Sequence, residues 1–288
     1  MAHAADAGLV YACITHVPLW IEFPDYVTTI RLGRAQADGQ LNLRELAPEW
    51  EPHHPVVGGT AGSFALKNYL LKHRRDATRV GICQYRKFVS RQRISGVRDP
   101  KYRSMDVVGK AALQGPAFAE LLHPGEHDFL VSGPLRFTRL PWHPRGYLKE
   151  YARDHCAEDL LRFTAEAVAQ GVLDRAEVLP FFREDVFIPG GIELGVYPAA
   201  FWLDGIEQVE RVVRACVERH PGRRDGYQAR AWAFCAERLG SWLLLKQFRK
   251  GRRDAFEWLQ RRRWSKRHVG QLNLITEDDA HQGYVGGT

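Results

Sequence analysis

Two cations follow an aromatic ring at Tyr85, Arg86 and Lys87, directly after a short apolar run. A guanidinium binds phosphate through two parallel hydrogen bonds, and an ammonium binds it as a point charge. The preceding run, Val80–Cys83, is rich in β-forming residues and predicts a buried strand. Open α/β sheets bind their ligands at the carboxyl ends of strands. The position therefore favours a phosphate site, with a solvated basic turn as the alternative.

Two later segments carry polar residues at helical spacing. Tyr151, His155 and Asp159 are four residues apart, which places them on one face of a long helix predicted over 145–170. They could bind a ligand, or a His–Asp pair could pack the helix against a sheet. Arg230 and Glu237 share a face of a second helix, predicted over 227–248. An Arg–Glu pair there is most simply a buried structural contact, with an active-site role as the alternative.

The nonapeptide Val80–Phe88 resembles the hallmark Ile-Gly-Leu-Cys-His-Tyr-Arg-Arg-Tyr/Phe of a glycosyltransferase-like family found in bacterial capsule, exopolysaccharide and O-antigen gene clusters. Gln84 replaces the usual histidine and Lys87 the second arginine. Two later stretches are also similar to that family, one from Tyr151 to Asp159-Leu160 and one running from Tyr227 through Glu237-Arg238-Leu239. The resemblance spans about 63–248 and implies the GT-A fold, a Rossmann-like sheet that holds a nucleotide-sugar.

The resemblance implies an enzyme that moves a sugar from a nucleotide donor, expected to be UDP-linked, to a saccharide or lipid-linked acceptor during surface polysaccharide synthesis. The residues expected at the donor are Thr15, His16, Gln84, Tyr85, Arg86 and Lys87. Those expected to bind the acceptor or support the site are Tyr151, His155, Gly190, Gly191, Arg230, Glu237 and Arg238. His16 could equally be an ordinary turn residue before Val17-Pro18.

Activating a sugar hydroxyl calls for a general base within hydrogen-bond reach. Asp185, which stands where the family has asparagine, is the first candidate, with Glu193 and Asp159 in reserve. No Asp-x-Asp metal motif follows the strand at Val80–Cys83, so fixed cations are expected to stabilise the leaving diphosphate. Asp278, Asp279 and His281 are weak candidates for a divalent metal site.

The sequence predicts that these residues are positioned by a mixed GT-A-like α/β sheet flanked by helices, with a helical C-terminal part. Strands are predicted at 9–15, 26–32, 80–83, 129–132 and 184–195, and helices at 64–73, 111–122 and 198–219. On the last helix, Trp202, Ile206, Val209, Val213 and Cys216 form an apolar stripe that predicts core packing. Residues 41–55 are predicted to be a surface loop and 273–288 a polar tail.

The composition fits a soluble globular protein, because 45% of the 288 residues are hydrophobic and 26% are charged. The start of the chain lacks the pattern of a signal peptide, and no apolar run is long enough to cross a bilayer. The five scattered cysteines read as reduced thiols in a cytoplasmic protein. One domain is expected over 1–248, followed by a basic helical extension and polar tail over 249–288.

The basic segment, Arg249–Arg267, holds nine Lys/Arg against two acidic residues, which accounts for the whole formal net charge of +7. Interleaved Phe256, Trp258 and Trp264 suggest peripheral contact with anionic lipid at the inner face of the membrane. Packing onto the domain is the alternative. Nucleic-acid binding is not expected, because the basicity is confined to this segment. A non-catalytic nucleotide- or polysaccharide-binding protein is the remaining alternative to an enzyme.

Overall fold

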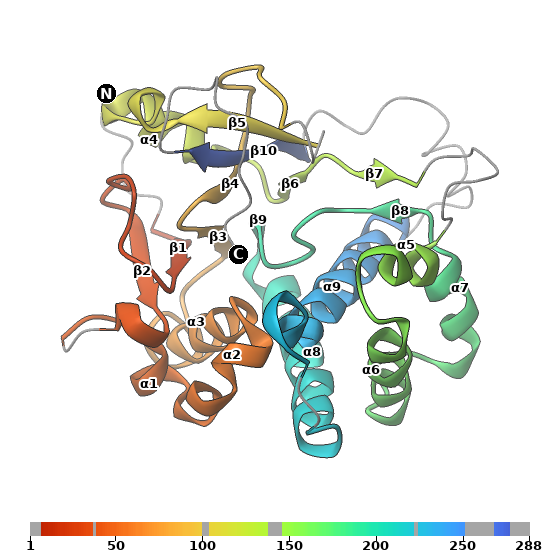
Figure 1. Cartoon of the computed structure of the whole chain (residues 1–288). Coiled ribbons are helices and arrows are strands. Elements are labelled where there is room, and N and C mark those ends of the chain that lie inside the picture. The colour runs from red at the N-terminus through yellow and green to blue at the C-terminus, as the bar shows by residue number, and fades with distance from the viewer. Residues whose placement is uncertain are drawn as a thin grey trace.

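A computed structural model describes residues 7–36, 39–99, 104–137, 146–221, 224–250 and 268–276. These residues form a mixed α/β fold in which most helices lie against one side of a sheet. In Figure 1 the strands β4, β5, β6 and β10 lie at the top, α4 lies beside them, and the remaining helices lie below. The mixed α/β sheet flanked by helices is thus confirmed.

The first half of the sheet is parallel. The strand β1 (Leu9–Thr15) lies between β2 (Val27–Arg31) and β3 (Arg79–Gln84) and runs parallel to both. Its side chains alternate between two cores, because Val10, Ala12 and Ile14 face the helices whereas Tyr11 and Cys13 face the opposite side. Burial on both faces explains why β1 is a continuous apolar run, which is typical of parallel strands.

The second half of the sheet closes on itself. β4 (Lys87–Ser90) returns antiparallel to β3 and pairs with β10 (Val269–Thr276), and β10 also pairs with β5 (Met105–Gly109) and with β6 (Leu130–Ser132). β9 (Gly195–Pro198) then pairs antiparallel with both β6 and β3. The pairings β3-β4-β10-β6-β9-β3 therefore form a closed ring of five strands.

The helices of the described residues alternate with these strands along the chain. The α-helices are α1 (Leu43–Leu46), α2 (His54–Val57), α3 (Thr60–His73), α4 (Gly115–Leu122), α5 (Tyr147–Asp154), α6 (Ala157–Ala169), α7 (Val178–Arg183), α8 (Ala199–Arg219) and α9 (Ala231–Arg249). The 3-10 helices are η1 (Gly33–Ala35), η2 (Pro48–His53), η3 (Lys110–Ala112), η4 (Arg175–Glu177) and η5 (Gly226–Arg230). A separate two-stranded sheet pairs β7 (Leu135–Arg136) with β8 (Val186–Phe187).

Four expectations from the sequence are wrong. Residues 41–55 are not a surface loop but α1, η2 and the start of α2, because Trp50 is only 1% exposed and donates its indole N–H to Glu210 at 2.7 Å. The helix predicted over 145–170 is broken at His155, which has extended backbone angles. The strand predicted over 184–195 is limited to Val186–Phe187, followed by a loop up to Gly195, where β9 begins. The polar tail predicted from residue 273 begins at the wrong place, because 273–276 belong to β10.

Asn273 shows how the sheet accepts this polar residue. Its side chain is fully buried, and its amide nitrogen donates to the Ser90 hydroxyl across the β4–β10 pair and to the carbonyl of Gln271, both at 2.8 Å. The stripe predicted on α8 is confirmed as core, since all five of its residues are fully buried. In the described part of the chain, no helix is both long and apolar enough to span a membrane.

The domain boundary at residue 248 remains a prediction. Residues 269–276 of the expected extension return to the main sheet as β10. Residues 251–267, which hold most of the basic segment, lie outside the described residues, as does the tail from 277 onward.

Candidate functional site

A glycine turn ahead of α3 brings together three side chains from distant parts of the sequence. A Cβ added to Gly58 would lie 3.4 Å from Cδ of Arg230, and one added to Gly59 would lie 3.4 Å from Nε2 of Gln84. The next residue, Thr60, has its hydroxyl 3.0 and 3.1 Å from the two carboxyl oxygens of Glu193. The turn thus joins the end of β3, the start of α9 and the loop before β9.

Arg86, Lys87 and Arg230 supply positive charge at this place. The backbone N–H of Tyr85 donates to the carbonyl of Ile14 at 3.2 Å, which fixes the turn between β3 and β4 beside the end of β1. The pKa of Lys87 is lowered, mainly because the ammonium is largely withdrawn from water. The nearby carboxylate of Glu237 raises that pKa, and the charges of Arg86 and Arg230 lower it. The charges of Arg86, Arg230 and Glu237 therefore all lie near enough to Lys87 to act on its ammonium.

Aromatic rings border the cations on the side of β1. The His16 ring stands edge-on to Tyr85 with ring centres 5.2 Å apart, and Trp20 approaches the same tyrosine at 5.6 Å. The guanidinium of Arg86 lies 5.5 Å from the centre of the Tyr85 ring. Burial lowers the pKa of His16, and the nearby charges of His54, Arg230 and Arg86 lower it further. His16 is thus held as a neutral imidazole beside the cations.

Thr15 contributes by shaping the turn. It is buried, and its hydroxyl donates to the carbonyl of Val17 at 2.5 Å, so its side chain is committed to the loop that presents His16.

Two carboxyl groups lie on the other side of the cations. Burial raises the pKa of Glu193 to about 8, the hydrogen bond from Thr60 opposes that rise, and the charge of Glu237 adds to it. Glu237 accepts a hydrogen bond from the backbone N–H of Gly190 at 2.7 Å. Two interacting carboxyl groups in different surroundings are typical of acid–base chemistry.

The Gly190-Gly191 pair allows the loop before β9 to lie directly on α9. Both residues have positive φ, +85° and +50°. A Cβ on Gly191 would lie 2.7 Å from the backbone carbonyl of Glu237 and 3.0 Å from the N–H of Ser241. Only glycine fits this close approach without a shift of the backbone.

The N-terminus of α3 adds a further positive feature. Its N-cap residue is Gly59, and no side chain caps the helix. The N–H groups of Ala61 and Gly62 donate to the carbonyls of Gly58 and Gly59 at 3.3 and 2.9 Å, so these two groups are already paired. The helix start still carries the positive end of the helix dipole, which together with Arg86, Lys87 and Arg230 favours an anion at this place.

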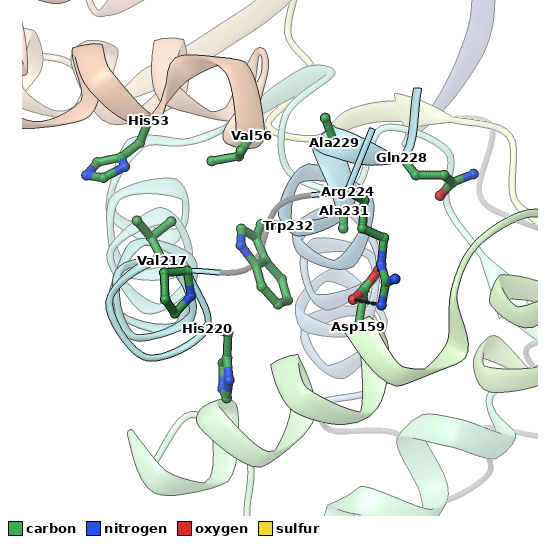
Figure 2. A pocket seen from close by; sticks show the side chains of 11 residues that line it. His53, Val56, Asp159, Val217, His220, Arg224, Gln228, Ala229, Ala231 and Trp232 are labelled. Carbon is green, nitrogen blue, oxygen red and sulfur yellow. Dashed lines mark hydrogen bonds and ion pairs between the residues drawn. The ribbon is translucent and has the colours of Figure 1, made fainter. Parts of the chain in front are cut away.

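Asp159 and Asp185 lie apart from this cluster. Asp159 is buried and forms a two-point ion pair with Arg224, at 2.6 and 2.8 Å. The pair lines a cleft of about 110 Å³, which His53, His220, Gln228 and Trp232 also line. Figure 2 shows these side chains and the Asp159–Arg224 pair. Asp185 directly precedes β8, and its backbone carbonyl accepts from the N–H of Phe137 at 2.9 Å.

Arg238 has a structural position. It is only 4% exposed, donates to Glu150 at 2.7 Å and lies 4.8 Å from the centre of the Tyr151 ring. The buried Arg–Glu pair of this region is therefore Arg238–Glu150. In the described part of the chain, no ion pair joins Arg230 to Glu237, so the expectation of that pair is wrong.

The described residues contain no cluster of three His, Cys, Asp or Glu side chains that could hold a metal ion. Asp278, Asp279 and His281, the residues proposed from the sequence, lie outside the described residues.

Sequence reasoning missed Thr60 and His54 as members of the site. Thr60 is separated from Glu193 by 133 positions, and no periodicity links such distant residues. His54 lies 6.4 Å from His16 between ring centres. The available signal was the pair Gly58-Gly59 before a helix, which is typical of a close approach between a backbone and its neighbours.

We predict that Asp185→Asn keeps near-normal turnover. The change removes a charge but keeps the size of the side chain, at a position beside β8 rather than at the glycine turn. The measurement is kcat with the donor and acceptor at saturation. A loss of about 100-fold or more, the size typical of a lost general base, would return the role of base to Asp185.

The fold is similar to that of a solved structure titled WbbM bifunctional glycosyltransferase, in its apo form. The TM-score is 0.68 at 12% sequence identity, and the match covers 93% of this chain and 45% of that one. This chain thus spans less than half the length of that structure. No protein-family model matches the chain, and no curated protein sequence matches it.

Proposed function

We propose that this chain is a glycosyltransferase of the GT-A type, which moves a sugar from a nucleotide-sugar donor to a saccharide acceptor. One observation carries the proposal. Three cations, Arg86, Lys87 and Arg230, lie close to two interacting carboxyl groups, Glu193 and Glu237, and to the start of α3, beside the ends of β1 and β3. The fold it shares with a glycosyltransferase supports the same reading. At that level of identity the likeness concerns the fold, so donor and acceptor are part of the proposal.

Arg86, Lys87 and Arg230 would hold the diphosphate of the donor. The leaving nucleoside diphosphate gains negative charge as its bond to the sugar breaks, and fixed positive groups stabilise that charge without reorganising. His16, Tyr85 and Trp20 would border the nucleobase, because they lie beside the cations at the end of β1. Uridine is the expected base, following the resemblance in the sequence.

Glu193 would act as the general base. An acceptor hydroxyl forms the new bond to the anomeric carbon, and its proton passes to the Glu193 carboxylate. The bond from the anomeric carbon to the phosphate oxygen breaks, and its electron pair leaves with the diphosphate. A carboxyl group whose pKa is about 8 suits this task, because a base is most effective when its pKa lies near the working pH.

The biological setting is part of the proposal. Capsule or exopolysaccharide synthesis, a cytoplasmic location and a lipid-linked acceptor follow from the resemblance in the sequence. Contact with anionic membrane would use the basic segment, whose residues 251–267 lie outside the described residues. Co-sedimentation with vesicles of increasing phosphatidylglycerol content tests it, and binding that does not rise with anionic lipid would contradict it.

Thermal-shift measurement with nucleotides tests the proposed function. A ligand that binds only the folded state raises the melting temperature by mass action. We expect UDP and UDP-sugars to raise it more than uridine, with EDTA and Mg²⁺ arms to measure the contribution of a metal ion. A protein that binds nucleotide-sugars but transfers no sugar to any acceptor would be a binding protein of the same fold. The absence of any nucleotide effect would contradict both.

A further inference from the structure

An exposed aromatic patch lies next to the candidate site, and the chemistry described so far does not use it. The patch consists of Tyr227, which is 58% exposed, and of Phe234 and His155, which are half-buried. Ring centres are 4.2 Å apart for His155 and Phe234, 4.9 Å for Tyr227 and Phe234, and 6.1 Å for His155 and Tyr227. The three ring planes are inclined to one another by 33° or less. The three rings therefore pack against one another, and Tyr227 is the exposed member.

Arg230 connects this patch to the charged site. Its guanidinium lies 4.9 Å from the centre of the Tyr227 ring and 5.7 Å from that of Phe234. The side chain of the same arginine packs beside Gly58, and its charge lowers the pKa of both His16 and Lys87. One side chain thus contacts the aromatic patch and faces the place where the donor diphosphate is proposed to bind.

The patch is built rather than accidental. His155 lies at the break between α5 and α6, and its Nδ1 is 3.0 Å from Oε1 of Gln228. The amide group of Gln228 in turn donates to the carbonyl of Asp154 at 2.9 Å. These contacts hold the imidazole plane against Phe234. Burial also lowers the pKa of His155, so the ring is neutral at pH 7 and offers an uncharged face.

We propose that the aromatic patch binds the acceptor saccharide, by stacking of a sugar ring on Tyr227 next to Arg230. The C–H face of a pyranose is apolar and packs on aromatic rings, whereas its hydroxyl groups need polar partners at the rim. Arg230 and Gln228 provide such partners. The inference rests on the proposed glycosyltransferase function and names where the acceptor enters the site.

A saccharide explains the patch better than a nucleobase does. A second aromatic group, His16, Tyr85 and Trp20, already lies against the cations at the end of β1. The two aromatic groups approach the cations through different residues, Arg86 for the first and Arg230 for the patch. If the diphosphate binds between the two aromatic groups, the nucleobase contacts His16, Tyr85 and Trp20. The patch is then available to the acceptor.

Saturation-transfer NMR with a panel of neutral methyl hexopyranosides tests the inference on the full chain. We expect transfer to sugar C–H protons in the unmodified protein, with binding weakened about three- to ten-fold in Tyr227→Ala, the range expected for one aromatic contact. Tyr227→Phe keeps the ring and should keep binding. Tyr69→Ala is the matched control, because Tyr69 also lies beside a histidine, with ring centres 5.5 Å apart, but in the C-terminal half of α3.

Two outcomes would overturn the inference: no transfer to any methyl hexoside in the unmodified protein, or unchanged transfer in Tyr227→Ala. A thermal-shift measurement with UDP on the same proteins separates this result from the proposed function. If UDP still raises the melting temperature of Tyr227→Ala, the donor site is intact and only the acceptor assignment is at stake. If UDP has no effect on the unmodified protein, the proposed function itself fails. Because Tyr227 is largely exposed, its replacement should leave the melting temperature without ligand unchanged.

Discussion

Replacing Arg86 by alanine is expected to weaken the binding of nucleoside diphosphates by about 1.5–3 kcal/mol, the range for a hydrogen bond to a charged group. That loss corresponds to roughly 10- to 150-fold in Kd. Binding of the nucleoside alone should change little, because the nucleoside carries no phosphate for Arg86 to hold. Calorimetric titration of UDP and uridine into the same protein measures both numbers.

The matched control is Arg162→Ala. It removes the same charge from an exposed i,i+4 ion pair with Glu158 on α6. If the loss of any positive charge weakened UDP binding, both variants would bind UDP equally weakly. If Arg86 contacts the diphosphate, only Arg86→Ala should bind UDP more weakly. An equal loss for UDP and uridine in Arg86→Ala would show that the residue supports the loop rather than the phosphate.

The second large effect is expected for Glu193→Gln, in which turnover should fall by about 100-fold or more, as is usual when a general base is lost. Glutamine keeps the size of the side chain and still accepts from the Thr60 hydroxyl. In the unmodified protein, kcat/KM should rise with pH up to about 8, the pKa to which burial raises this carboxyl group. The variant should lose that rise. Asp185→Asn is the control for the same acid-to-amide change at a position outside the cluster.

Stability provides a second measurement on Glu193→Gln that does not depend on activity. Between the ordinary pKa of 4.5 and the raised value of about 8, the unfolded chain has released the proton and the folded chain still holds it. Each pH unit in that window therefore lowers the unfolding free energy by up to about 1.4 kcal/mol from this group. The loss is absent below pH 4.5 and complete above about pH 8.

Glutamine cannot ionise, so Glu193→Gln should melt higher than the unmodified protein near pH 8, and the difference should vanish near pH 4. Melting temperatures across that range give the test. A difference that is the same at every pH would mean that Glu193 is already ionised in the folded protein. Its assignment as a base with a raised pKa would then be wrong.

The sequence was a good guide to strands and helices whose apolar pattern continues along their whole length. Leu9–Thr15 and the helix ending at Arg219 were predicted with bounds within a residue, because their apolar patterns are continuous. The cationic turn at Tyr85–Lys87 was found for the same reason, since it directly follows a buried strand.

Local patterns could not reveal β10 or the break at His155. β10 contains Gln271 and Asn273, which read as a polar tail until the strand pairs with β4 and Ser90 accepts the Asn273 amide. Tyr151, His155 and Asp159 keep helical spacing, but the contacts of His155 with Phe234 and Gln228 favour an extended backbone there. Both outcomes depend on residues more than 70 positions away.

The closed ring of strands has a consequence for how the protein is made. β10 comes from 269–276, yet it lies between β4 and β6, and the N–H of Ile275 donates to the carbonyl of Arg86 at 2.8 Å. The ribosome must therefore release residue 276 before the cationic turn gains its support. Until then β4 and β6 present unpaired edges, the kind of surface on which chains aggregate. During synthesis, these two edges therefore stay open until β10 has left the ribosome.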